Sequence, residues 1–97
     1  MGTEEDFIGF ITEIHPSAEG DAIGQILVES HADKIVTRYV ITVKNETPIF
    51  RQDGDGLRRA AFQAFEDKQW VEIWFAGPTS GSSPVRGTAA QAVIQQA

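Results

Sequence analysis

The chain has 97 residues and carries eight Lys and Arg against fourteen Asp and Glu, for a formal net charge of −6 at pH 7. This length predicts a single domain, residues 1–97, with an ordered core at about 7–95, and the negative charge disfavours nucleic acid by repelling phosphate backbones. The sequence contains no cysteine, which excludes disulfides, thiolate zinc sites and thiol nucleophiles.

The first residues include Glu4, Glu5 and Asp6, where a secretory signal needs basic residues followed by an apolar run. No apolar stretch approaches the length that crosses a bilayer. We therefore expect a soluble chain without a membrane span, and the residues themselves leave its compartment open.

Three strand-like runs come first. Residues 7–15 are apolar on both alternating faces and contain Gly9, as in a long first strand that bends at a glycine. A loop rich in turn residues leads to residues 22–30, and a short hairpin connection leads to residues 35–44. In the third run the more apolar set is assigned to the interior: Ile35, Thr37, Tyr39, Ile41 and Val43.

A helix is predicted next, over residues 56–68. Residues 47–50 read as a short extended piece, and Asp55 is placed to accept hydrogen bonds from the first helical amides. On a helical wheel four apolar residues share one face, which we expect to plug one end of a barrel: Leu57, Ala61, Ala64 and Phe65.

Two further strands follow the predicted helix. In residues 69–76, Val71, Ile73 and Phe75 alternate with polar or tryptophan positions, and we expect Ile73 and Phe75 to meet Tyr39 and Ile41 in the interior. Residues 88–95 alternate weakly after a long loop. Three strands, one helix and two strands are typical of an OB fold. The predicted fold is therefore mainly β, a five-stranded OB-fold barrel with one α-helix between strands three and four.

Three segments carry a resemblance to a known family: residues 47–50 (TPIF), 71–78 (VEIWFAGP) and 83–89 (SPVRGTA). In their order and spacing the chain resembles the YobA-like family of small Gram-positive domains of unknown function, from about residue 9 to residue 94. Many members of that family look like exported lipoproteins, so the resemblance implies an extracytoplasmic location. It brings no catalytic residue and no cofactor.

The ligand face of an OB barrel is the outer face of its second and third strands. Leu27, Val36 and Val40 make this face partly apolar, which suggests either a protein-contact surface or a face that the chain's own loop covers. Arg38 can anchor a carboxylate there or lie across its neighbours toward water. The whole predicted face consists of Gln25, Leu27, Glu29, His31, Val36, Arg38 and Val40.

Trp70 and Trp74 are four residues apart, so both side chains lie on one face of the fourth predicted strand, on either side of Glu72. Paired tryptophans form sugar-stacking platforms or interface anchors. Alternatively, they pack against the helix or the chain termini.

A single-strand nucleic-acid binder needs exposed aromatic side chains for stacking and a basic groove. Tyr39 is the only aromatic residue in the second and third runs, and its parity turns it inward. Nucleic-acid binding would need Tyr39 exposed and the following basic residues gathered in one groove: Arg38, Lys44, Arg51, Arg58, Arg59 and Arg86.

Candidate metal and catalytic residues do not match known patterns. Residues 53–56 (DGDG) resemble part of a calcium loop, but with Gly56 at the sixth position Arg51 and Phe62 stand where carboxylate ligands belong. The histidines, His15 and His31, have no nucleophile motif that would place a serine beside them. We predict no metal, no cofactor and no catalytic residue.

The sequence thus favours a non-catalytic binding or interaction module, monomeric or weakly dimeric, whose ligand or protein partner it does not name. An oligonucleotide binder is the alternative, by fold analogy alone, and a small hydrolase comes third. The candidate contact residues are Leu27, His31, Val36, Arg38, Val40, Trp70 and Trp74.

Overall fold

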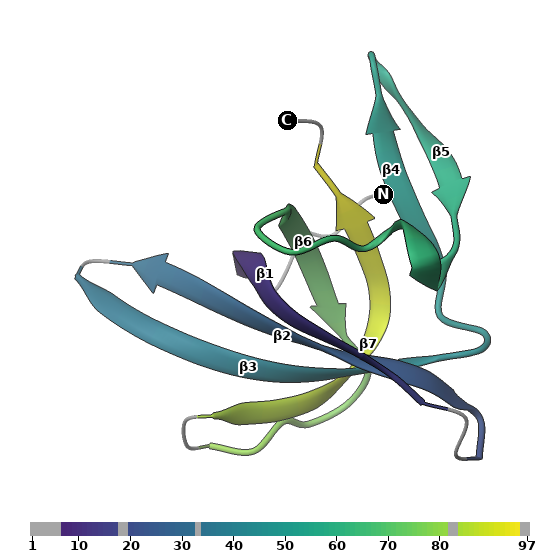
Figure 1. Cartoon of the computed structure of the whole chain (residues 1–97). Coiled ribbons are helices and arrows are strands. Elements are labelled where there is room, and N and C mark those ends of the chain that lie inside the picture. Colours follow the sequence, from purple (N-terminus) through teal and green to yellow (C-terminus); the bar gives the residue numbers. More distant parts are fainter. Residues whose placement is uncertain (1–6, 18–19, 33, 82–83, 96–97) are drawn as a thin grey trace.

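The computed structural model describes residues 7–17, 20–32, 34–81 and 84–95 (Figure 1). The acidic residues 4–6 and parts of three predicted loops, at 18–19, 33 and 82–83, lie outside this set. The described residues form seven strands and one 3-10 turn: β1 (Phe7–Pro16), β2 (Ala22–Ala32), β3 (Ile35–Lys44), β4 (Ile49–Asp53), β5 (Gly56–Ala60), η1 (Phe62–Ala64), β6 (Trp70–Phe75) and β7 (Val85–Ile94).

Five of these strands close into a barrel. β1 pairs antiparallel with both β2 and β6, β2 pairs with β3, and β6 pairs with β7. The barrel closes where β3 and β7 run parallel, with Tyr39 opposite Val85 and Thr42 opposite Thr88. This strand order fits an OB-like barrel and confirms the mainly β prediction.

The predicted helix is wrong. Residues 56–60 form β5, which pairs antiparallel with β4: Ala60 lies opposite Ile49 and Gly56 lies opposite Asp53. The described residues contain no α-helix. Gly54 has φ +65°, as the first residue of a two-residue hairpin turn requires, so Gly54 and Asp55 form the turn of a hairpin, and Asp55 does not cap a helix. The ladder to β4, which itself pairs with β7, overrides the helical propensity of this segment.

Two phenylalanines close the barrel end that the helix was expected to plug. Phe62 in η1 and Phe65 just after it are buried, and their rings meet edge to face with centroids 5.5 Å apart. Gly24 of β2 lies directly beneath, and a Cβ at this position would overlap the ring of Phe62. The short segment of residues 62–65 therefore closes this end of the barrel, where the sequence predicted a helix.

The interior follows the predicted alternation along the strands. Ile41, Val43, Val71 and Ile73 are fully buried, as predicted. Ile35, which was also assigned to the interior, is 65% exposed, because the far end of the β2–β3 hairpin extends beyond the barrel (Figure 1).

Phe7 completes the interior at the end opposite Phe62. Its ring stacks on Tyr39 with centroids 3.8 Å apart and planes 9° apart, and Phe75 lies 5.6 Å from it. All three side chains pack against the buried core. The inward placement predicted for Tyr39 and Phe75 is confirmed.

The bend in β1 differs from the predicted one. The register with β2 shifts between Ile11 and Glu13, so Thr12 is the extra residue of a bulge. Gly9 serves a close approach instead, because a Cβ there would lie 2.5 Å from the carbonyl oxygen of Glu29 on β2.

Candidate ligand-binding face

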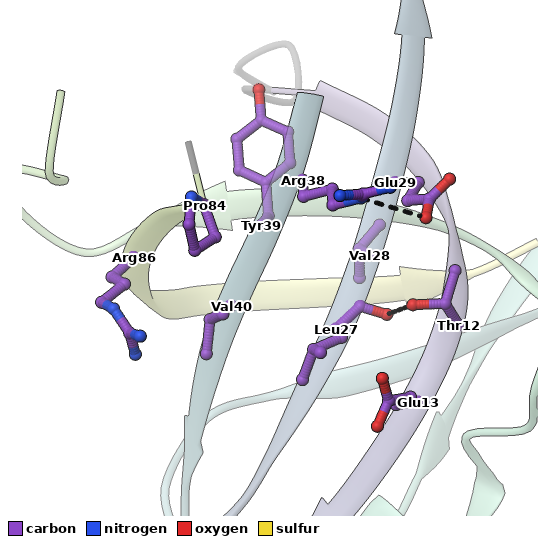
Figure 2. Close-up of a pocket in the computed structure, with 10 residues that line it drawn as sticks. All are labelled: Thr12, Glu13, Leu27, Val28, Glu29, Arg38, Tyr39, Val40, Pro84 and Arg86. Carbon is purple, nitrogen blue, oxygen red and sulfur yellow. Dashed lines mark hydrogen bonds and ion pairs between the residues drawn. The ribbon is translucent and has the colours of Figure 1, made fainter. Parts of the chain in front are cut away.

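An open groove of about 620 Å³ lies on the outer face of β2 and β3, where OB folds bind their ligands. Figure 2 shows Leu27 and Val40 between Thr12 and Glu13 from β1 on one side and Pro84 and Arg86 on the other. The groove is lined by Thr12, Glu13, Leu27, Val28, Glu29, Arg38, Tyr39, Val40, Pro84 and Arg86.

The floor of the groove is aliphatic because of strand alternation. Leu27 and Val40 are cross-strand partners whose neighbours Val28 and Ile41 are buried, so their own side chains point outward. Both remain only half-buried. This pair therefore forms a small, partly exposed aliphatic patch on the outer face.

The β1 bulge forms one wall. Thr12 donates a hydrogen bond from Oγ1 to the carbonyl oxygen of Leu27 at 3.3 Å, which holds the bulge against β2. The bulge turns Glu13 toward the groove, where its carboxylate lies 3.0 Å from Nε2 of the exposed His15.

Glu29 links two of the predicted contact residues. Its carboxylate lies 3.5 Å from Nε of Arg38 and 3.5 Å from Nε2 of His31. The Arg38 side chain is 72% exposed, whereas that of Glu29 is 25% exposed. Solvent-exposed ion pairs contribute about 0–1 kcal/mol, so Arg38 can exchange Glu29 for another carboxylate at little cost.

Arg86 occupies the opposite wall. It pairs with Val40 across the parallel β3–β7 ladder, and its backbone is fixed by Ser80, whose Oγ accepts a hydrogen bond of 2.8 Å from the Arg86 amide. Among the described residues its guanidinium has no ion-pair partner. The groove thus has a second arginine that can receive an anion.

An aromatic stripe lies on the neighbouring outer face. The Phe10 ring lies 5.2 Å from the ring of His31 and 5.4 Å, edge to face, from that of Trp70. Trp70 is 50% exposed, while Trp74 is half-buried. The two tryptophans therefore differ in exposure, and Trp70 packs edge to face against Phe10 of β1.

The structure gathers some predicted contact residues and separates others. Leu27, Arg38 and Val40 line the groove, and His31 joins its margin through Glu29. Val36, 47% exposed, lies further out on the hairpin. Sequence analysis missed Thr12, Glu13, Phe10 and Pro84, and it named Arg86 only as a basic residue for nucleic acid.

The other basic residues of that predicted nucleic-acid groove lie apart from it, with local partners. Among the described residues, Lys44 pairs with Asp21, Arg51 with Glu66 and Arg58 with Asp53, and Arg59 lies over the Phe50 ring at 5.7 Å. Only Arg38 and Arg86 of the six line the groove.

Within the described ranges, no three His, Cys, Asp or Glu side chains come together as a metal site. The segment that resembled a calcium loop is the β4–β5 turn, where Asp53 pairs with Arg58 at 2.8 Å. The described part of the chain also has no helix long and apolar enough to span a bilayer.

Comparison with family models, with curated proteins and with solved structures finds no match to this chain.

Proposed function

We propose that this chain is a non-catalytic binding module that holds an extended segment of a protein partner on the outer face of β2 and β3. The observation that carries the proposal is the groove itself. Its aliphatic floor, Leu27 and Val40, runs between the carboxylates of Glu13 and Glu29 and the guanidinium of Arg86. A polypeptide offers aliphatic side chains and charges of both signs, and therefore matches such a surface.

The described residues of the chain's own long loop cover this face only in part. Pro84 borders the groove, but the preceding described residues bond to the other side of β7: Ala76 donates to the Thr88 carbonyl at 2.8 Å and Ser80 to that of Arg86 at 3.0 Å. Leu27 and Val40 stay half-buried as a result. This arrangement supports a contact surface over the alternative of a covered face.

An oligonucleotide binder is the second proposal. Fold analogy supports it, as does the stripe of half-buried Phe10 with exposed His31 and Trp70, because bases stack on exposed aromatic rings. The net charge of −6 and the engaged basic residues weigh against it. The Tyr39 ring, stacked on Phe7, is also not available as an outer platform.

The resemblance to the YobA-like family stays a prediction, and with it the extracytoplasmic location that the family implies. We also retain a monomer or weak homodimer as the expected state in solution, and no enzymatic activity or cofactor.

A peptide selection tests the proposal. A displayed library of random dodecapeptides is selected on the wild-type protein, and the enriched peptides are titrated by fluorescence anisotropy against Val40→Asp and Leu57→Asp. The groove variant should lose at least about tenfold in affinity, because a carboxylate replaces the apolar floor. Leu57, 55% exposed on β5, is the matched control and should leave affinity unchanged.

Two results would reject the protein-segment proposal: no peptide is enriched, or the enriched peptides bind Val40→Asp as tightly as wild type. A labelled single-stranded oligonucleotide serves as the parallel arm. Binding of this probe that weakens steeply with salt would favour the second proposal.

A further inference from the structure

The third strand has an open edge directly beside the groove. Residues 35–38 pair with β2 on one side, and β7 joins β3 only from Tyr39 onward. Among the described residues, nothing pairs with residues 35–38 on the other side. Their alternate backbone N–H and C=O groups therefore point out of the sheet unpaired.

The described β3–β7 ladder begins just after Pro84. In the parallel register Tyr39 is opposite Val85, so the next residue of an extended ladder, Pro84, would face Arg38. The β3–β7 pairs begin one residue later, at Val85. The described part of the preceding loop continues along the β6 side of β7, away from the open edge.

The two open edges of the sheet differ in character. The β5 edge presents the exposed charges Arg58 and Arg59, a usual protection against pairing with other chains. The β3 edge instead presents three β-branched and uncharged residues, Ile35, Val36 and Thr37, followed by the exposed Arg38. Ile35 and Val36, on opposite faces, are 65% and 47% exposed. This edge is suited to accept another strand.

We propose that the partner segment adds to β3 as an extra strand at residues 35–38, and that an acidic side chain of this strand is bound by Arg38 and Arg86. This inference rests on the proposed function and specifies its partner: an extended, β-branched peptide with one Asp or Glu. Strand addition supplies main-chain hydrogen bonds, while side-chain positions supply specificity.

Charge complementarity places the acidic residue. Arg38 and Arg86 both lie on the outer face, because Arg86 is opposite Val40, two residues along β3 from Arg38. Diagonal neighbours of this kind lie about 7–8 Å apart, so two side chains as long as arginine can both contact one carboxylate. An incoming strand would occupy the place that β7 leaves at Pro84, so a residue beside Arg38 also meets Arg86.

Hydrogen exchange measured by NMR tests the proposal. The probe is a terminally blocked octapeptide of alternating valine and threonine with one central aspartate, added to ¹⁵N-labelled and methyl-labelled protein. Alternate amides within residues 35–38 should exchange rapidly in the free protein and at least about tenfold more slowly with saturating probe.

The arginine contribution is tested separately. Replacing the probe aspartate by asparagine should weaken binding about three- to tenfold on the wild-type protein, since a carboxylate between two guanidinium groups loses its charge. That difference should disappear in Arg38→Gln/Arg86→Gln. It should persist in Arg58→Gln, a control on the other open edge.

The outcomes separate this inference from the proposed function. Probe-induced shifts of the Leu27 and Val40 methyl groups without protection of residues 35–38 would keep the binding face and overturn strand addition. No shift at either place would count against both. Edge amides already protected in the free protein would also overturn the proposal. If this protection in the free protein rises with protein concentration, the edge is occupied by a second copy. If it does not depend on concentration, the edge is occupied by the chain itself.

Discussion

Gly24 and Phe62 should be energetically coupled, because the aromatic ring occupies the space in which a side chain at Gly24 would lie. The ring atoms Cζ and Cε1 are the nearest neighbours of a Cβ built there, together with the His15 carbonyl oxygen at 2.9 Å. Gly24→Ala should therefore cost about 1–3 kcal/mol of unfolding free energy through overpacking.

Phe62→Leu removes the two overlapping ring atoms while keeping an apolar side chain at the barrel end. On its own it should cost about 1–2 kcal/mol, from lost burial and a small void. In the double variant, the alanine methyl group fills part of that void. We expect the double variant to be about 1 kcal/mol more stable than the sum of the single losses predicts.

Urea unfolding followed by tryptophan fluorescence measures this cycle, since two tryptophans lie on β6, with midpoints and slopes compared for all four proteins. The control cycle pairs Phe62→Leu with Gly87→Ala, whose new methyl group would meet the Phe75 ring at 2.7 Å instead. That cycle should be additive to within about 0.5 kcal/mol. Equal additivity in both cycles would refute the placement of Phe62 over Gly24.

Three further changes test other parts of the fold. Ile73→Ala, in the fully buried interior, should lower the unfolding free energy by about 2–5 kcal/mol in urea titrations, whereas Ile35→Ala on the exposed hairpin should stay within about 0.5 kcal/mol. Gly54→Val should cost about 1–2 kcal/mol at φ +65° by the same assay, and Gly56→Ala, in open space, much less. Burial raises the pKa of Tyr39 above 10.0, so the stability that its neutral phenol contributes is complete below pH 10 and is lost as pH rises through the folded-state pKa. The ultraviolet absorbance of this single tyrosine should therefore change at a higher pH than that of a free tyrosine. Tyr39→Phe should remove the extra loss of stability at alkaline pH. Titration of Tyr39 at an ordinary pKa, or equal effects of a variant and its control, would contradict the corresponding placement.

The barrel strands are readable from sequence because period-two alternation reports burial directly. Val71 and Ile73 show it plainly, and Ile41 and Val43 follow the same rule. Residues 56–65 misled for the opposite reason: Leu57, Ala61 and Phe65 share a helical face, yet only Phe65 is buried. Whether this segment forms a helix or a strand depends on its pairing with β4, which pairs in turn with β7. The helical periodicity of the segment carries no information on these partners.

The candidate face was predictable only where it depends on alternation. Leu27, Arg38 and Val40 were placed correctly by parity. Glu13 reaches the groove through the bulge at Thr12, and a bulge is a property of strand pairing rather than of the residues alone. Arg86 joins through a parallel contact between distant segments, for which a single sequence offers no signal.

The parallel ladder between β3 and β7 also governs how this chain acquires its shape. Until Val85 reaches Tyr39, the barrel stays open between β3 and β7, and the apolar side of the curved sheet is covered only in part, by β6 and the phenylalanines of residues 62–65. Topologies dominated by such distant pairings fold in about milliseconds to seconds, far slower than helical bundles. A chain emerging from the ribosome therefore cannot close the barrel beside Ile41 until more than forty further residues have been synthesised, since residue 85 follows residue 41 by 44 positions, and its open apolar side is exposed to aggregation until then.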